Sequence, residues 1–468
     1  MTSTPSQSSI VELQDPNSQA YRKARRLHLK TTRNRDQAAI ESEWTPFRAA
    51  EKKFKAKFPP PDLSGVLDLA LLECNGSDGL RDEEVQMGGW RGALGCVEVR
   101  EIGLDLLTGD GTELGKQTRR AFTFPEIPGL VLLPSCLSHT TQRSLIQWSL
   151  RDHAKYPTIT NLDTHYVLPR EGVWNAYLKS RDPGYDEEAV QPVASILPTS
   201  LAPPSPSPGR TLITNPPASP ESFSTLLKTP LPPPAPSSTI PPLPPSSLIS
   251  KLRWANLGWF YHWGTKQYDF KAGKGEMGEE VKDICKKIVR GVRWGEVFGR
   301  EGESVLDSEE GNFEAQAEWG EGGEDWMDWS ETYEPDAGIV NFYQTKDTLM
   351  AHVDRSEICA TSPLVSISLG SAAVFLIGGL TRSTPPIPIL LRSGDVVIMS
   401  GPACRRAYHG VPRILENTLP PHLVALGPTA SDSENQEWEP YAEYLRHARI
   451  NVNVRQVFPK GFDPNITK

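Results

Sequence analysis

A strand-like segment in the last part of the sequence constrains the fold more than any other feature. Residues 449–458 read RINVNVRQVF, and polar and apolar residues alternate along them. In an extended strand this pattern puts four polar side chains on one face, those of Arg449, Asn451, Asn453 and Arg455. The opposite face is then formed largely by Ile450, Val452, Val454 and Val457. An exposed edge strand would not explain two arginines and two asparagines on one face of an otherwise apolar strand.

Other short strands are predicted in the same half of the chain. Residues 364–377 begin with alternation and continue as an apolar run, and residues 387–401 break at Ser393-Gly394 as strand, tight turn and strand. Many short strands separated by turn residues favour a sandwich or jelly roll, whose interior can hold a small ligand. Residues 66–180 add apolar runs and one amphipathic helix within 139–156. We therefore expect an α+β protein.

Changes in composition divide the chain into four segments. We expect a basic, partly disordered arm at 1–65, a mixed segment packing on the core at 66–182, a Pro- and Ser-rich insert at 183–250, and the main domain at 251–460. Prolines number 43 in 468 residues, about 9% against a usual ~5%, and many lie in the insert. Such a segment cannot bury enough apolar surface to offset its ordering entropy, so it should be disordered. A docking site for a proline-binding partner is the alternative to a plain linker.

The formal charge of −9 is the sum of an acidic region and a remainder with net positive charge. Residues 301–336, an acidic loop within the main domain, hold fourteen Asp or Glu and no Lys or Arg, which leaves +5 for the rest of the chain. Residues 21–35 hold seven Lys or Arg and no acidic residue. This basic segment is either a solvated helix or tail, or an arm that contacts phosphates or directs nuclear import.

The remaining composition predicts a soluble intracellular protein without a membrane partner. No run of ~18 apolar residues is present to span a bilayer. The first 20 residues contain Glu12 and Asp15 and no apolar core, unlike a signal peptide or a good mitochondrial transit peptide. Six cysteines lie far apart without a CxxC pair, which favours a reducing compartment. The nucleus, the cytoplasm and the mitochondrion all stay open as locations.

Two histidines of the β-rich half stand in positions that suit a metal. His352-Val353-Asp354 places an imidazole and a carboxylate on the same side of an extended chain, as two cis ligands require. His409 lies 57 residues later, after the strand pair that would return the chain across the barrel. Two histidines and one carboxylate leave three positions open on Fe(II), enough for a bidentate co-substrate and O2.

A His-x-Asp pair alone is weak evidence for a metal site because it occurs by chance in many chains. The strand that carries Arg449 and Arg455 strengthens this evidence. A chelated 2-oxo acid with a second carboxylate needs a fixed, fork-shaped cation, which Arg449 or Arg455 can supply better than a lysine. Asn341 and Tyr343, just before the metal strand, add an amide and a phenol that point the same way. Together these residues offer donors for both ends of 2-oxoglutarate.

The motifs occur in the order found in the AlkB family of Fe(II)- and 2-oxoglutarate-dependent dioxygenases, which the sequence resembles. They are Asn-x-Tyr at Asn341 and Tyr343, His-x-Asp at His352 and Asp354, the distal His409, and Arg-x-Asn-x-x-x-Arg at Arg449, Asn451 and Arg455. Flanking segments such as KLRWANLGWFYHW and SISLGSAAVFLIGGL are similar to the eukaryotic homologue-one branch. The similarity covers about 120–180 and 250–460.

The resemblance implies a double-stranded β-helix (jelly-roll) catalytic core with an N-terminal helical or mixed extension. It implies His352, Asp354 and His409 as Fe(II) ligands and catalytic residues. It also implies Arg449 as the partner of the distal 2-oxoglutarate carboxylate, with a pocket completed by Asn341, Tyr343, Asn451 and Arg455. The co-substrate would be decarboxylated to succinate while O2 oxidises a substrate C–H bond.

One position departs from the bacterial members of the family. They carry a second acidic residue two positions after the ligand aspartate, where this chain has Ser356. This departure argues against bacterial-style repair of alkylated single-stranded DNA. Residues 254–261 occupy the place of the nucleotide-recognition lid, where Trp259 and Tyr261 could stack a flipped base. Burial in the core is the alternative for Trp254 and Trp259, and Tyr261 is the better candidate for the lid.

The expected activity is therefore demethylation or hydroxylation of methylated bases in nucleic acid. The homologue-one branch favours RNA, and tRNA in particular, over DNA. A protein hydroxylase or histone demethylase on the same core is one alternative, and a non-catalytic nucleic-acid-binding module is another. A complete set of ligands disfavours the second alternative, because a decayed site would be expected to lose at least one of them.

Overall fold

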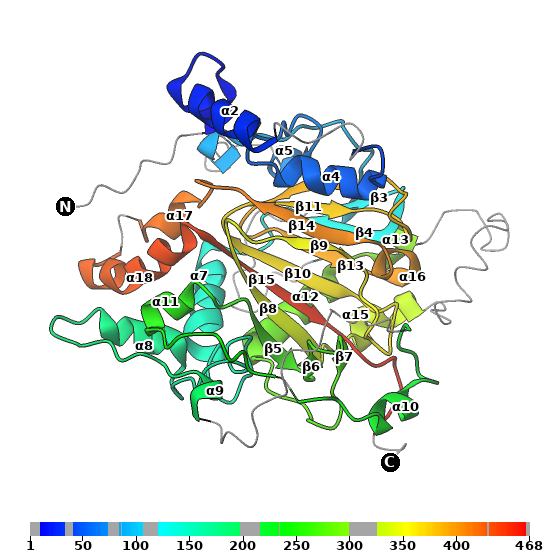
Figure 1. Ribbon diagram of the computed structural model, residues 1–468. Coiled ribbons are helices and arrows are strands. Elements are labelled where there is room, and N and C mark those ends of the chain that lie inside the picture. Colours follow the sequence, from blue (N-terminus) through cyan, green and yellow to red (C-terminus); the bar gives the residue numbers. More distant parts are fainter. Residues whose placement is uncertain are drawn as a thin grey trace.

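A computed structural model describes residues 10–32, 41–73, 84–85, 87–105, 120–196, 216–233, 235–298, 325–427 and 430–464. Two packed β-sheets occupy its centre and helices surround them (Figure 1). Eight consecutive strands, β8 to β15, are divided equally between the two sheets. The larger sheet receives β8 (Ala337–Gln344), β10 (Leu364–Gly370), β13 (Val396–Met399) and β15 (Ala448–Arg455). The smaller sheet receives β9 (Leu349–His352), β11 (Ala373–Ile377), β12 (Ile387–Leu391) and β14 (His409–Ile414).

All neighbouring strands of this set pair antiparallel, in the orders β13-β10-β15-β8 and β12-β11-β14-β9. Two facing antiparallel sheets joined in this way have the architecture of a jelly roll. The predicted α+β class and sandwich-like core are therefore confirmed.

Strands from the first half of the chain extend both sheets. The larger sheet continues beyond β13 with β4 (Ile127–Leu133), β3 (Arg120–Phe124) and β2 (Arg100–Gly103), and ends beyond β8 with β5 (Trp254–Gly258). In the smaller sheet β1 (Leu67–Asp68) pairs parallel to β12. The segment expected at 66–182 thus shares hydrogen-bonded sheets with the main domain. A separate hairpin consists of β6 (Tyr261–His262) and β7 (Gln267–Tyr268).

Two glycines let the chain pass from one sheet to the other. Gly370 has φ +84° and ends β10, so the predicted run 364–377 is two strands in different sheets. Gly394 has φ +88° in the predicted turn between β12 and β13. The Asp395 carboxylate fixes this turn by accepting hydrogen bonds from the backbone N–H groups of Arg392 (2.7 Å) and Ser135 (2.9 Å). Left-handed backbone at these corners favours glycine because it has no Cβ.

Apolar side chains form three main layers. One fills the space between the two sheets, and another covers the outer face of the larger sheet. The helices that supply the second layer include α7 (His139–Gln147), its π-helical continuation η2 (Trp148–His153), α8 (Gly172–Ser180), α11 (Pro245–Ile249), α12 (Glu279–Gly291), α13 (Trp294–Phe298), α15 (Trp329–Thr332), α17 (Pro421–Val424) and α18 (Asp432–Leu445). Helices α7 and η2 lie where the amphipathic helix was predicted.

The third layer lies under α4 (Pro46–Lys55), which covers the outer face of the smaller sheet with Phe47 and Phe54. Residues 46–55 therefore belong to the core, although the sequence placed them in the basic arm. Helix α2 (Gln19–Thr32) matches the basic segment and has no buried residue. It contacts the segment that follows α4 through Tyr21, whose ring lies 5.1 Å from that of Phe58.

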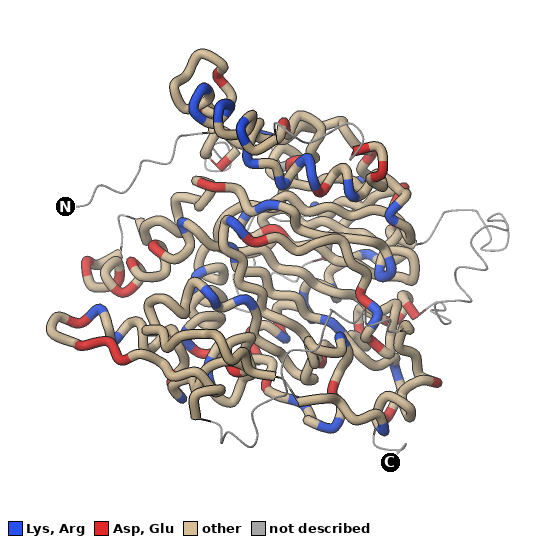
Figure 2. Tube along the Cα trace, in the orientation of Figure 1, with Lys and Arg blue, Asp and Glu red and all other residues tan. Residues whose placement is uncertain are grey.

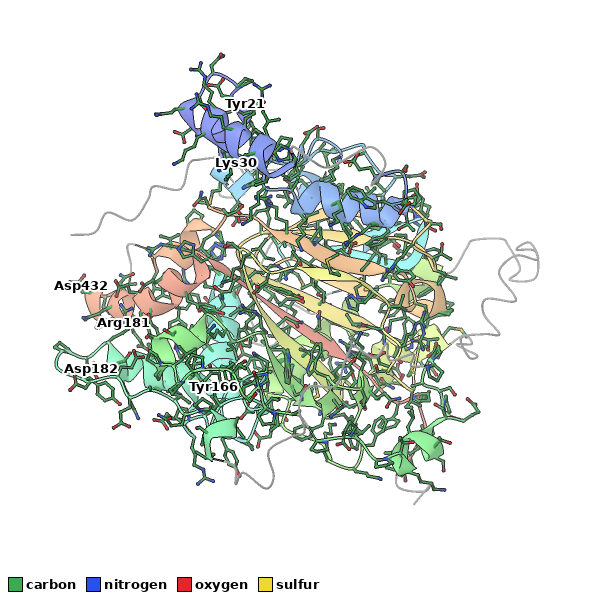
Figure 3. All side chains as sticks on the ribbon, in the orientation of Figure 1. Tyr21, Lys30, Tyr166, Arg181, Asp182 and Asp432 are labelled. Carbon is green, nitrogen blue, oxygen red and sulfur yellow. The ribbon has the colours of Figure 1, made fainter. Side chains whose placement is uncertain are left out.

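On the other side of the molecule Arg181 joins α8 to α18, and Figure 3 shows it far from Tyr21 and Lys30 of α2. Its guanidinium pairs with Glu443 (2.7 Å) and Glu439 (3.0 Å).

The shorter elements are α1 (Ile10–Gln14), α5 (Leu69–Glu73), η1 (Met87–Gly89), α9 (Val193–Ile196), α10 (Phe223–Lys228), η4 (Asp325–Asp328) and α16 (Gly401–Arg405). In the described part of the chain, no helix has the length and apolarity needed to cross a bilayer.

The expectation of disorder throughout 183–250 is not confirmed. Residues 216–233 and 235–250 are described, and the Phe223 side chain of α10 is 1% exposed. Its ring lies 5.1–5.6 Å from the rings of Phe270, Phe458 and Phe462. The reason is that one aromatic anchor gains enough buried apolar area to hold a proline-rich segment against the core. Residues 197–215 of the insert and 301–324 of the acidic loop lie outside the described residues.

Phe223→Ala should lower the free energy of unfolding by about 3–5 kcal/mol, because it empties a buried aromatic site. Denaturant titration of the full chain measures this change. Lys228→Ala, at an exposed position of the same helix, is the control and should stay within about 0.5 kcal/mol. A Phe223→Ala protein as stable as this control would show that α10 does not dock on the core.

Candidate metal centre and co-substrate pocket

Three predicted ligands converge at one end of the two sheets. His352 ends β9, His409 begins β14, and the two residues are paired in the strand register. Their ring centroids lie 4.4 Å apart. Nε2 of His352 lies 3.7 Å from Oδ1 of Asp354, and the ligand atoms of all three residues lie within 4.8 Å of one another. Within the described chain, this is the one group of three such side chains that could hold a metal ion.

Backbone carbonyls orient both imidazoles. Nδ1 of His352 lies 3.0 Å from the carbonyl oxygen of Met350, and Nδ1 of His409 lies 3.0 Å from that of Ala407. A carbonyl oxygen only accepts, so each Nδ1 carries a hydrogen, and Nε2 is the atom through which each ring can bind a metal. Burial lowers the pKa of His409 to about 4, and its imidazole is therefore neutral near pH 7.

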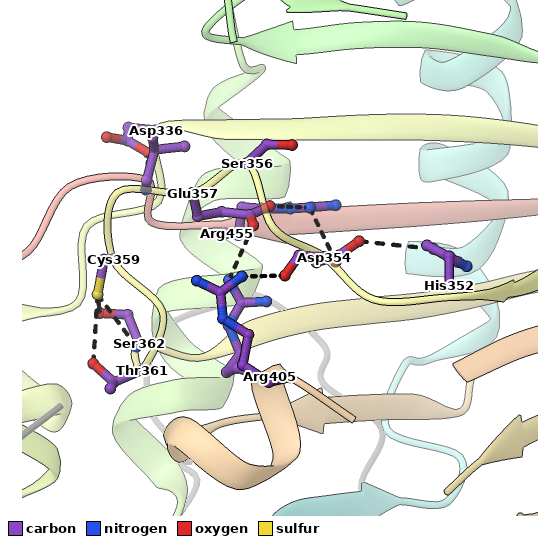
Figure 4. Close-up of polar contacts among 12 residues, drawn as sticks. Asp336, His352, Asp354, Ser356, Glu357, Cys359, Thr361, Ser362, Arg405 and Arg455 are labelled. Atoms are coloured by element: carbon purple, nitrogen blue, oxygen red, sulfur yellow. Dashed lines mark hydrogen bonds and ion pairs between the residues drawn. The ribbon is translucent and has the colours of Figure 1, made fainter. Parts of the chain in front are cut away.

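Asp354 lies in a network of buried charged groups (Figure 4). Its Oδ2 is 3.2 Å from Nη1 of Arg455, which also donates to the buried carboxylate of Glu357. Burial alone would raise the pKa of Asp354, but the charge of Arg455 outweighs it and holds the pKa well below its usual range. Arg406 donates to the main-chain oxygen of Asp354, and Nη2 of Arg405 lies 4.0 Å from Glu357 Oε2.

Arg455 thus contacts a candidate metal ligand, which the sequence did not predict, and its predicted place in the co-substrate pocket stays a prediction. Sequence reasoning also missed Glu357, Arg405 and Arg406. The sequence could have indicated them only through charged residues close to both histidine motifs. Glu357 lies three residues after Asp354, and Arg405 and Arg406 lie shortly before His409. Their importance depends on burial, which leaves each of the three only 1% exposed.

Arg449 presents the feature expected of a carboxylate-binding residue. It is 1% exposed, and its Nη2 donates to Oγ of Ser368 at 2.8 Å. Its Nε and Nη1 have no hydrogen-bond partner among the described residues. Burial lowers its pKa to about 10, so the guanidinium is charged at neutral pH. A buried cation with two unsatisfied N–H groups fits the second carboxylate of a dicarboxylic co-substrate.

The other predicted pocket residues share the inner face of the larger sheet with Arg449. Strand register pairs Tyr343 with Arg449 and Asn341 with Asn451. The Tyr343 ring lies 5.9 Å from the Arg449 guanidinium, and burial raises the pKa of Tyr343 to about 12. The Asn451 amide donates to Ser366 Oγ and to the Ile367 carbonyl, both at 2.9 Å. Asn451 therefore braces β10 against β15 beside the pocket.

The two predicted substrate-contacting residues lie in different environments. Trp259 packs in an aromatic cluster, 5.6 Å from the rings of both Phe270 and Phe458. Tyr261, on β6, hydrogen-bonds with the Ser356 side chain, and burial raises the pKa of its phenol to about 12. It lies close enough to Asp354 and Arg455 for their charges to act on this phenol.

An aromatic pair beside Tyr261 was not predicted. Trp263 stacks on Trp254 with a centroid distance of 5.0 Å and an interplanar angle of 24°, and its side chain is 38% exposed. Tyr261 meets the Trp263 ring edge-on at 5.1 Å. The sequence contains Trp263 directly after the lid segment, but only the β6–β7 hairpin brings it onto Trp254.

The residues 213–455, about half of the chain, match the 2OG-Fe(II) oxygenase superfamily, and the chain belongs to that superfamily. Its members generally use Fe(II), 2-oxoglutarate and O2. The resemblance to the AlkB family is also confirmed by relatives of the homologue-one branch.

One relative, tRNA demethylase abh1 of Schizosaccharomyces pombe, is 28% identical over 418 residues, which cover 88% of this chain and 96% of the relative. Human nucleic acid dioxygenase ALKBH1 is 33% identical over 230 residues, covering 46% of this chain and 48% of the human protein. A solved structure of OsALKBH1 is 19% identical, with a TM-score of 0.35, over 70% of this chain and 97% of that chain.

Arg449→Lys should weaken 2-oxoglutarate binding roughly 10- to 100-fold, because an ammonium cannot reproduce the two-pronged contact with a carboxylate. Calorimetric titration with 2-oxoglutarate and Mn(II) in place of iron measures this without turnover. Arg446→Lys, at an exposed position three residues earlier, should leave the affinity unchanged. Equal affinities for all three proteins would remove Arg449 from the pocket.

Proposed function

We propose that this oxygenase removes or hydroxylates methyl groups on nucleic-acid bases, with RNA, and tRNA in particular, favoured over DNA. The main support is that four side chains lie in the same space between the two sheets. His352, Asp354 and His409 lie together there, and Arg449 has N–H groups without a hydrogen-bond partner among the described residues. The substrate class is supported by the names of the relatives, which include a tRNA demethylase and nucleic acid dioxygenases.

We assign the three converging residues to Fe(II). Two imidazoles and one ionised carboxylate form a donor set that suits this ion and leaves positions open for other ligands. When bound with 2-oxoglutarate and O2, the metal supplies oxidation of a substrate C–H bond while the co-substrate becomes succinate and CO2. Arg455 holds the Asp354 carboxylate ionised and oriented, and Glu357 balances part of the arginine charge.

We assign Arg449 to the distal carboxylate of 2-oxoglutarate, with Tyr343 and Asn341 beside it on the same face. Two parallel N–H groups from the guanidinium would fix the orientation of the co-substrate as well as its affinity. Burial of Arg449 strengthens this contact because little water competes for its charge. Asn451 supports the pocket by holding β10 in register.

We assign recognition of the base to Tyr261 and to the stacked pair Trp254 and Trp263. The exposed part of Trp263 offers a stacking surface for an unpaired base. Tyr261 contacts Trp263 edge-on and hydrogen-bonds with Ser356, two residues after Asp354. Hydroxylation of an N-methyl group gives a hydroxymethyl group that breaks down to formaldehyde and the unmodified base. Hydroxylation of a C-methyl group leaves a stable hydroxymethyl base.

Trp263→Ala should raise the KM for a methylated oligonucleotide about 5- to 150-fold, because one base-stacking contact is worth ~1–3 kcal/mol. Trp259→Ala is the matched comparison and should instead lower the free energy of unfolding by about 3–5 kcal/mol, since it removes a packed aromatic ring. Steady-state kinetics and denaturant titration separate the two effects. An unchanged KM for Trp263→Ala would remove this residue from substrate binding.

Mass spectrometry of cells lacking the gene tests the substrate class. We expect methylated nucleosides to accumulate in bulk tRNA and to return to normal when the wild-type gene is restored. A His352→Ala gene should not restore them, because this protein should form no succinate from 2-oxoglutarate, whereas His447→Ala should behave as wild type. Accumulation confined to histone peptides, or rescue by His352→Ala, would contradict the proposal.

A further inference from the structure

A hollow of about 600 Å³ lies outside the two sheets, between α4 and β9. Its floor includes Met350 and Ala351, the two residues that precede His352 in β9. The side chains that line it include those of Trp44, Arg48, Glu51, Lys52, Lys55 and Arg382. The hollow and the metal centre thus share one strand.

Two side chains fix the walls of the hollow to the main chain of Ala351. Oε1 of Glu51 accepts from the Ala351 N–H at 2.6 Å, and Nη2 of Arg382 donates to the Ala351 carbonyl at 3.0 Å. These bonds satisfy polar backbone groups of β9, which is the edge strand of its sheet. Any ligand held by these walls would therefore have a defined position relative to His352.

Positive charge predominates in the hollow. Its lining has four cationic side chains against the carboxylates of Glu43 and Glu51. Glu51 is 4% exposed and is already engaged by Arg48 at 3.1 Å and by the Ala351 N–H. Lys55 donates to the Thr348 hydroxyl at 3.3 Å, and Arg382 lies over the Tyr408 ring at 5.2 Å. These contacts leave the charges of Lys55 and Arg382 available to an anion.

An aromatic side chain accompanies these cations. Nζ of Lys52 lies 5.8 Å from the ring of Trp44, which is partly exposed at the entrance to α4. Figure 2 shows further Lys and Arg residues along α2 and α4 on this side of the molecule. Cations interleaved with an aromatic ring suit a flexible polyanion that carries stacking bases.

We propose that this hollow, which we call the α4 groove, binds the phosphate backbone of a single-stranded nucleic acid beside the nucleotide that enters the metal centre. The proposal rests on the proposed function for the identity of the polymer, and it adds a second contact area that the base-binding residues do not provide. Because the groove contacts phosphates rather than base edges, it binds RNA and DNA through the same chemistry.

The test uses the full chain and unmodified single-stranded RNA and DNA oligonucleotides, with affinity measured by fluorescence anisotropy at several salt concentrations. Lys52→Gln/Lys55→Gln should weaken binding roughly tenfold at low salt and reduce the slope of log K against log salt by about 1.4, or ~0.7 for each lost phosphate contact. Arg170→Gln/Lys179→Gln removes the same charge from exposed positions on and before α8 and should leave both values unchanged.

Arg382→Gln is a second variant in the same groove and should reduce the slope by about 0.7. Thermal melting confirms that each variant is folded. An unchanged slope in both groove variants would overturn the proposal, as would a loss of affinity for a polyglutamate peptide without a loss for the oligonucleotides. Binding of unmodified strands requires no turnover. The assay can therefore confirm phosphate binding by the α4 groove even if the proposed methyl oxidation is wrong, and it can refute phosphate binding even if the oxidation is correct.

Discussion

Strand β15 lies between β8 and β10, and the register of these two pairings determines the geometry of the site. Arg449 pairs with Tyr343 on one side and Gly370 on the other, and Asn451 pairs with Asn341 and Ser368. Side chains alternate between the faces of a strand, so a slip by one residue would turn the polar face away from the space between the sheets. The apolar residues of β15 prevent this slip because Ile450, Val452 and Val454 are fully buried on the opposite face.

The same strand links the two halves of the candidate site. Arg449, near its beginning, has unsatisfied N–H groups in the pocket, and Arg455, at its end, contacts Asp354. The network around Asp354 has three arginines and two carboxylates, so without a metal it carries an excess of positive charge. That excess stabilises the ionised carboxylate, and it also suits a dianionic co-substrate bound nearby.

Local patterns made part of this arrangement predictable. Alternation along 449–455 indicated which side chains share a face, and the spacing of His352 and Asp354 indicated a metal pair. The network of Glu357, Arg405 and Arg406 was not predictable in this way, because it depends on segments that meet only in the folded chain. For the same reason the order of residues 216–233 and 235–250 of the proline-rich insert was not predicted: their composition indicates disorder, but the docking of Phe223 depends on a distant aromatic cluster. Residues 46–55 were likewise placed in a basic arm, because the contacts of Phe47 and Phe54 with the smaller sheet form only in the folded chain.

Each imidazole of the candidate metal centre is oriented by the carbonyl oxygen of the residue two positions before it. In many metal sites the second nitrogen of a histidine is held by a side-chain carboxylate, which a mutation can remove. Here the tautomer of each imidazole is set by the course of its own backbone. Evolutionary change at positions 350 and 407 can therefore replace the side chains without changing which ring nitrogen of either histidine faces the carbonyl. The surroundings of the site can then diverge while its donor atoms stay the same.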